Sequence, residues 1–164
     1  MSQVTIRVLG IDPGLTKTGW GVVDSTGSRV AHVAHGVIAA SRDLSFASRL
    51  LHIYRQVEEV VERFGPHEAA IEETFVSVNA SSTLKLGHAR AAAILGVAQS
   101  GIEVSEYAAR FVKKAIVGTG AAEKAQIAFM IRRLLPSAGF TTSDSADALA
   151  VAITHVHSRV GKAV

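Results

Sequence analysis

With 164 residues, 48% of them apolar, and a formal net charge of only +3, the chain is long enough for one hydrophobic core, so we expect a single domain over residues 1–164. The absence of cysteine excludes disulfides, thiolate nucleophiles and zinc–thiolate sites, and it leaves oxygen or imidazole ligands for any metal. No apolar run approaches the ~18 residues of a membrane span, and Arg7 interrupts the place of a signal-peptide core, which predicts a soluble, unexported protein without a membrane partner.

The first part of the chain predicts three antiparallel strands. Residues 4–11 are rich in β-branched side chains, and the punctuation at Pro13 and Gly14 leads to a second β-like run over 20–24. A turn near Gly27 then introduces a third run over 29–39. Because the connections are short, these strands are expected to form an antiparallel meander.

Helical patterns alternate with strands in the next part of the chain. Apolar residues recur at helical spacing over 45–64, and residues 69–72 read as a short fourth strand. A second helix over 81–99 is apolar or small on nearly every face, which predicts burial on more than one side. A second copy of the chain could cover it through small residues such as Gly87, Ala91 and Gly96, and central packing within one chain is the alternative.

A fifth strand is expected over 102–107. Helices follow over residues 108–117, 122–135 and 145–160. An antiparallel meander continued by parallel strands, with helices on both faces, gives an α/β fold with a mixed five-stranded sheet. In such a sheet, the ligand crevice opens at the ends of the strands.

Four carboxylates lie at the ends of predicted elements. Asp12 ends the first strand, Glu72 ends the fourth, and Asp144 and Asp147 share the first turn of the last helix. If the fold brings them together, their mutual repulsion calls for divalent cations, and paired Mg²⁺ or Mn²⁺ ions are a common device for phosphodiester chemistry. Taken singly, each acid has a structural alternative as a turn cap, an ion-pair partner or a complement to a helix N-terminus.

Positive charge is concentrated in one stretch of the chain. Between residues 110 and 133 there is a single acid, Glu123, and the cations are Arg110, Lys113, Lys114, Lys124, Arg132 and Arg133. This stretch suits a phosphate backbone, and a solvated helix face is an equal alternative.

Taken in order, these segments resemble the RuvC family of Holliday junction resolvases (crossover junction endodeoxyribonucleases), within the ribonuclease H-like superfamily. The resemblance covers nearly the whole chain. It is carried by LGIDPG at 9–14, TGWGV at 18–22, AIEETF at 70–75, NASSTLKLGHAR at 79–90, EYAARFVK at 106–113, VGTGAAEK at 117–124 and DSADALAVAITH at 144–155.

The resemblance implies a ribonuclease H-like fold and a homodimeric endonuclease that nicks four-way DNA junctions symmetrically, in recombination and repair. It implies two Mg²⁺ ions per site, which Mn²⁺ could replace, and ends bearing 5'-phosphate and 3'-hydroxyl groups. Asp12 would bridge the ions, Glu72 and Asp147 would each bind one, and Asp144 would act as a ligand or orient the water. A branch-migration motor as partner and a cytoplasmic, nucleoid-associated location in bacteria are further expectations.

The resemblance also nominates DNA contacts. Phe75 matches an aromatic side chain that stacks on an unpaired base, with anchoring of the loop in the core as the alternative. Lys113 and Lys124 match phosphate-binding lysines, and Lys85 and Arg90 are weaker candidates for backbone contacts. The histidines of the last helix, His155 and His157, are expected at the surface.

Two other classes of protein remain as alternatives. A phosphotransferase of the actin-like ATPase superfamily also has a phosphate loop after Asp-x-Gly, but neither its second phosphate loop nor its adenosine-binding segment is found in these 164 residues. A non-catalytic junction-binding module would not need carboxylates at every matching position. Relatives commonly continue with a basic extension beyond the position of Val164, so truncation of the chain is also an expectation.

Overall fold

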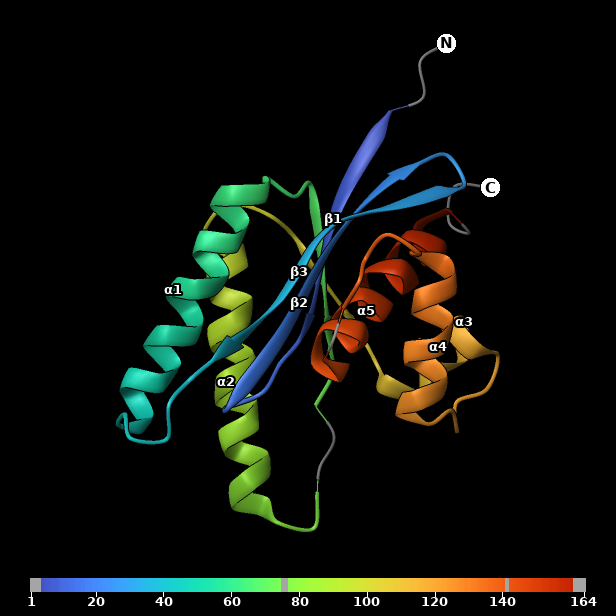
Figure 1. Cartoon of the computed structure of the whole chain (residues 1–164). Helices are drawn as coiled ribbons and strands as arrows, with labels where there is room; N and C mark the ends of the chain where they lie inside the picture. Colours follow the sequence, from blue (N-terminus) through green and yellow to red (C-terminus); the bar gives the residue numbers. More distant parts are fainter. Residues whose placement is uncertain (1–3, 75–76, 141, 161–164) are drawn as a thin grey trace.

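The computed structural model describes residues 4–74, 77–140 and 142–160. Its centre is one sheet with the strand order β3-β2-β1-β4-β5 (Figure 1). The first three strands pair antiparallel, and β4 and β5 continue the sheet parallel to β1. The strands are β1 (Thr5–Asp12), β2 (Lys17–Thr26), β3 (Arg29–Ala39), β4 (Glu68–Glu72) and β5 (Val104–Tyr107). The predicted meander and mixed sheet are therefore confirmed.

Helices cover both faces of this sheet (Figure 1). One layer consists of α1 (Phe46–Phe64) and α2 (Ala80–Ala98), and the other of α3 (Ala109–Val117), α4 (Lys124–Leu134) and α5 (Ser143–Val160). Most predicted helix ends differ from these by one or two residues, because capping interactions, and not the hydrophobic period, decide where a helix ends. The Ser45 side chain, for example, accepts a hydrogen bond from the Ser48 N–H and caps α1, while Gly65 ends that helix in the left-handed conformation.

The sheet separates two hydrophobic clusters. Leu9 and Ile11 of β1 face α1 and α2, whereas Val8 faces α5 on the other side. This central strand is buried on both faces, which explains why its sequence shows little alternation.

Helix α5 lies unusually close to the sheet. A Cβ atom added to Gly10 of β1 would lie 2.2 Å from the backbone oxygen of Ala148, and one added to Gly19 of β2 would lie 2.1 Å from that of Asp144. Only glycine fits at these positions, because any side chain would push the helix away. The two glycines therefore allow the first turns of α5 to lie directly beside the end of β1.

Helix α2 is covered on one side within the chain. Its residues Ala89, Ala93 and Val97 are buried, whereas Leu84 and Leu95 are 66% and 59% exposed. The alternative of central packing within one chain is therefore wrong, and coverage of the other side by a second copy stays a prediction.

The two glycines of α2 that were expected at a subunit contact differ from each other. Gly96 packs against Tyr54 and Val57 of α1, so its expected place in a subunit contact is wrong, whereas Gly87 has no atom near its Cβ position. In the part of the chain that the structure describes, no helix is long and apolar enough to cross a membrane.

The close approach of α5 generates a prediction. Gly10→Ala should lower the free energy of unfolding by roughly 1–3 kcal/mol, because the added methyl group collides with the backbone of α5. Gly87→Ala is the matched control: it meets no atom within 4 Å, and it should leave stability unchanged or raise it, because alanine favours helix. Urea unfolding at one protein concentration measures both variants, and equal stability of Gly10→Ala and wild type would contradict the packing.

Candidate active site

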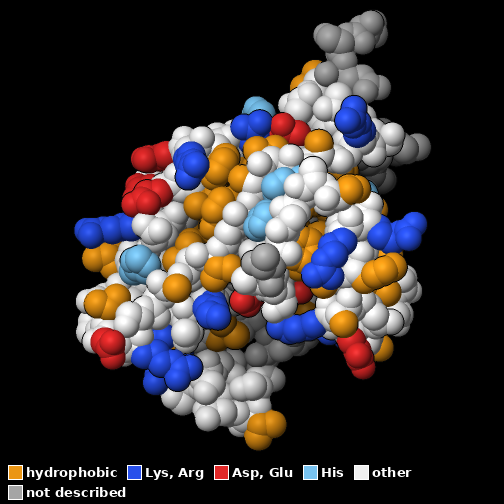
Figure 2. Space-filling view, viewed as in Figure 1, with side chains coloured by type: hydrophobic (Ala, Val, Ile, Leu, Met, Phe, Trp, Pro, Cys, Tyr) orange, Lys and Arg blue, Asp and Glu red, His pale blue; other side chains and the backbone are white. Residues whose placement is uncertain are grey.

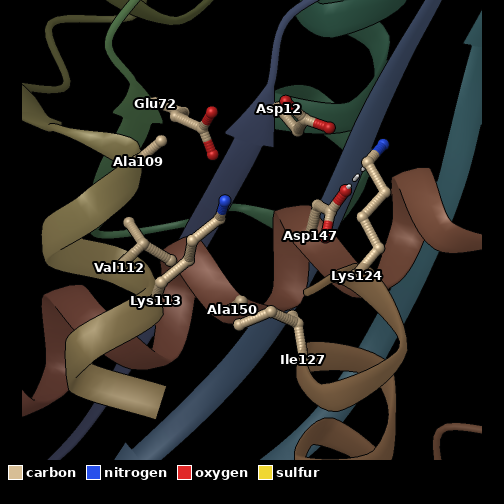
Figure 3. A pocket seen from close by; sticks show the side chains of 9 residues that line it. All are labelled: Asp12, Glu72, Ala109, Val112, Lys113, Lys124, Ile127, Asp147 and Ala150. Carbon is tan, nitrogen blue, oxygen red and sulfur yellow. Dashed lines mark ion pairs between the residues drawn. The ribbon is translucent and has the colours of Figure 1, made fainter. Parts of the chain in front are cut away.

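Three of the four predicted carboxylates meet at one edge of the sheet. Asp12 and Glu72 are the last residues of β1 and β4, and these strands are parallel neighbours with Ile11 opposite Ile71. Asp147 approaches from the start of α5. The three acids line one cavity of about 180 Å³ (Figure 3).

Two lysines share this cavity with the acids. Lys113 of α3 and Lys124 of α4 extend toward the carboxylates (Figure 3). Lys124 forms an ion pair with Asp147 at 3.6 Å, but its side chain is 73% exposed, so this pair contributes little to stability. The rest of the wall is apolar and consists of Ala109, Val112, Ile127 and Ala150. The cavity therefore combines buried negative charge with the positive groups of two long lysine side chains.

Burial and mutual repulsion shift the acids in one direction. Burial, followed by the charges of Glu72 and Asp147, raises the pKa of Asp12 to about 8. The pKa of Glu72 is raised by burial and then by Asp147, and that of Asp147 is raised by burial, while the two lysines oppose both shifts. The site thus holds more negative charge than its surroundings stabilise.

The donor set fits a hard divalent cation. All three side chains offer carboxylate oxygens, which Mg²⁺ and Mn²⁺ prefer, and a cation would relieve the repulsion that raises their pKa values. Among the described residues, no three acidic or histidine side chains already form a cation site. The fit therefore rests on donor chemistry and charge, and the two lysine ammonium groups point toward the acids from the cavity wall (Figure 3).

Asp144 differs from the other acids. It lies half-buried at the start of α5 and does not line the cavity. Its charge nevertheless raises the pKa of both Asp12 and Asp147, so it lies within electrostatic range of the site. The sequence could not distinguish Asp144 from Asp147, since both belong to the first turns of one helix.

Hydrogen bonds that motif spacing does not reveal support the loop that follows Asp12. The buried Thr18 hydroxyl donates to the Gly14 carbonyl at 2.8 Å and accepts from the Gly14 N–H at 3.2 Å. Arg49 of α1 donates to the Leu15 carbonyl at 3.1 Å and to the Thr16 hydroxyl at 3.2 Å. Motif spacing carries no signal for the contact of Arg49, because it joins residues more than thirty positions apart.

The predicted DNA contacts fall into different environments. Phe75, with its predicted stacking role and the core alternative, lies outside the described residues. Lys85 is exposed on α2, as a backbone contact requires. Arg90 instead has a side chain only 17% exposed and bonded within the protein. Figure 2 shows Lys and Arg side chains on either side of a small acidic group at the lower centre of one face, the end of the sheet where β1 finishes.

The prediction for the histidines of α5 is half wrong. His157 is exposed, as expected, but His155 is buried. The His155 ring hydrogen-bonds to the Tyr107 hydroxyl at 2.9 Å and to a Glu68 carboxylate oxygen at 2.8 Å. Histidine is buried here because both ring nitrogens find partners on β4 and β5, which a helical pattern cannot reveal.

The sheet order and the acidic cluster at the strand ends define the class of ribonuclease H-like nucleases. A family model described as crossover junction endodeoxyribonuclease RuvC matches residues 8–155, and the chain belongs to this family. Its membership in the family suggested by the sequence motifs is therefore confirmed.

Curated relatives and solved structures agree with this assignment. A crossover junction endodeoxyribonuclease RuvC of Caulobacter vibrioides is 59% identical over 97% of this chain and 94% of its own length. The structure of Thermus thermophilus RuvC in complex with Holliday junction substrate is 34% identical, with a TM-score of 0.87 over 95% of this chain and 96% of that one. The yeast mitochondrial Holliday junction resolvase Ydc2 is 15% identical over 98% of this chain and 86% of that one, and its TM-score of 0.65 shows a shared fold.

The raised pKa of Asp12 predicts how pH affects the metal-free protein. The contribution of the neutral Asp12 carboxyl to the free energy of unfolding is fully present below its ordinary pKa of 3.8. It is lost as pH rises through about 8, because the buried charge then opposes folding. Asp12→Asn should therefore be more stable than wild type at pH 9 by at least about 1 kcal/mol, given ~1.4 kcal/mol per pKa unit, and equal to it near pH 3. Urea unfolding in EDTA tests this, and equal stability at pH 9 would contradict it.

Proposed function

We propose that this member of the RuvC family resolves Holliday junctions, cutting two strands of a four-way DNA junction symmetrically to leave 5'-phosphate and 3'-hydroxyl ends. The observation that supports the proposal most is the single cavity shared by Asp12, Glu72, Asp147 and two lysines. Its chemistry suits a phosphodiester, since acids can hold divalent cations while lysines hold the phosphate. A non-catalytic junction-binding module would have no use for this arrangement of buried acids.

Each acid has a proposed role. Two Mg²⁺ ions, or Mn²⁺ in their place, would supply an activated water and stabilise the leaving 3'-oxygen. Asp12 is the proposed bridging ligand, and the strong influence of both Glu72 and Asp147 on its pKa supports a central place between them. Glu72 and Asp147 are the proposed ligands of individual ions. Asp144 is proposed to orient the attacking water or to complete the ligand set, since its charge reaches the site from outside the cavity.

The two lysines are proposed to hold the DNA backbone at the cavity. Lys124 lies close enough to Asp12, Glu72 and Asp147 for its charge to lower the pKa of each, and the charge of Lys113 does the same for Glu72 and Asp147. When DNA approaches, phosphate oxygens can replace carboxylates as partners of these flexible ammonium groups. The apolar wall formed by Val112 and Ile127 limits water at the same place.

Symmetric cutting requires two sites, so we propose a homodimer. The outer face of α1 and α2 forms an apolar surface around a cavity of about 360 Å³, lined by Leu50, Leu51, Tyr54, His88, Ala91, Ala92 and Leu95. Leu51 and Leu95 are 47% and 59% exposed, and such a surface suits a second copy of the chain.

The proposal also includes a single domain over residues 1–164, a branch-migration motor as a partner, and a cytoplasmic, nucleoid-associated location.

The homodimer can be tested on this surface. Leu95→Glu should convert the dimer to a monomer, because a charge would be buried at the contact. Sedimentation velocity measures the mass, and Leu134→Glu, an exposed leucine on α4, is the control that should remain dimeric. A Leu95→Glu variant with the mass of a dimer would place the contact elsewhere.

Removing the central charge should separate binding from cutting. Asp12→Asn should bind junction DNA about as well as wild type, because the lysines remain, while nicking in Mg²⁺ falls by more than about 100-fold. Binding is measured by gel shift without divalent metal, and nicking on a labelled four-way junction. Asp43→Asn, an exposed acid in the loop before α1, is the matched control with wild-type nicking. Undiminished nicking by Asp12→Asn would refute its role.

The role of the two lysines predicts how junction binding depends on salt concentration. Lys113→Ala and Lys124→Ala should each weaken junction binding and lower the slope of log affinity against log salt by about 0.9, the loss of one phosphate contact. Arg29→Ala, an exposed cation at the opposite end of the sheet, is the control and should keep the wild-type slope. Fluorescence anisotropy at several salt concentrations gives these slopes, and unchanged slopes for both lysine variants would contradict the assignment.

A further inference from the structure

The partners of Arg90 differ from those of a surface cation. Its Nε donates to the backbone carbonyl of Glu72 at 3.1 Å, and its Nη2 pairs with the carboxylate of Glu106. The side chain is 17% exposed, whereas Lys85 on the same helix is an exposed residue. Arg90 therefore has two defined acceptors within the chain: the half-exposed Glu106 carboxylate and the backbone carbonyl of Glu72, a residue of the acidic cavity.

The contact with Glu72 occurs where β4 ends. The sheet pairs Ile71 with Glu106 and Glu72 with Tyr107, and the Glu73 N–H still donates to the Tyr107 carbonyl at 2.9 Å. At this point α2 is bonded to β4, because the Arg90 guanidinium donates a hydrogen bond to the backbone carbonyl of Glu72. The same guanidinium holds Glu106 of β5, so one side chain joins the ends of two neighbouring strands to the helix behind them.

Arginine suits this role better than lysine. Its planar guanidinium presents donors in a rigid fork, so Nε and Nη2 can reach two acceptors without a change of rotamer. The base of the side chain is also fixed, because Ala89 and Ala93 on either side along α2 are buried in the hydrophobic cluster that α2 forms with α1 and the sheet. A backbone carbonyl held from such a rigid element restricts the direction in which the Glu72 side chain leaves the strand.

We propose that Arg90 is a positioning residue of the acidic site: it holds the end of β4 so that the Glu72 carboxylate faces the cavity, rather than binding DNA phosphate. This inference rests on the proposed function of Glu72 as a metal ligand. Groups that orient metal ligands typically change metal affinity by ~10–100-fold when removed.

The test compares metal binding with DNA binding. In Arg90→Gln, calorimetric titration of the DNA-free protein should show Mn²⁺ affinity lowered by about 10-fold or more, and half-saturation of nicking should move to higher Mg²⁺ by a similar factor. The salt slope of junction binding without divalent metal should equal that of wild type. Arg90→Lys should recover only part of the Mn²⁺ affinity, because a single ammonium cannot reproduce the fork. Lys85→Ala, which removes an exposed cation from the same helix, should leave Mn²⁺ affinity unchanged.

A salt slope lowered by about 0.9 in Arg90→Gln, with wild-type Mn²⁺ affinity, would identify a phosphate ligand and overturn the proposal. So would the absence of any change. If Arg90→Gln does not fold, Glu106→Ala removes only the ion pair and should lower Mn²⁺ affinity in the same direction by a smaller factor, and unchanged affinity there also overturns it. Failure of wild type to bind Mn²⁺ would instead refute the proposed metal site, whereas wild-type binding matched by all Arg90 variants refutes the positioning role alone.

Discussion

The close contact between α5 and the middle of the sheet is the constraint on which the site depends. Gly10 and Gly19 leave no side chain between the strands and the helix backbone, so α5 lies against β1 and β2. Asp147 on α5 thereby reaches the cavity that Asp12 shares at the end of β1. A bulkier residue at either glycine would separate the two acids as well as the two layers, so packing and chemistry are set by the same contact.

The carboxylate charges in this cavity destabilise the folded state. Burial raises the pKa of Asp12, Glu72 and Asp147, and Lys113 and Lys124 reduce this strain only in part. Proteins accept such local conflict at functional sites because the surrounding structure supplies the stability. Here the two hydrophobic clusters, one on each side of the sheet, stabilise the fold. A divalent cation would turn the same repulsion into an attraction, which is the physical basis of the proposed metal dependence.

The two helical layers contribute different kinds of side chain around the site. Helices α3 and α4 contribute the flexible lysines that face the cavity, which suits a substrate that arrives and leaves. Helices α1 and α2 contribute arginines that donate hydrogen bonds within the protein itself: Arg49 to the loop after Asp12, and Arg90 to the end of β4. Lysine suits the first task because it is a mobile point charge, and arginine suits the second because its donors are held in a fixed fork.

The sequence by itself determined the order of the elements, the mixed sheet and the strand-end positions of Asp12 and Glu72, because hydrophobic period and turn residues are local signals. Family motifs added the identity of the acids and the lysines. Only the tertiary structure separated Asp147, which lines the cavity, from Asp144, and only it gave His155 and Arg90 their internal partners. Those outcomes depend on contacts between residues far apart in the chain, and such contacts leave no trace in local spacing.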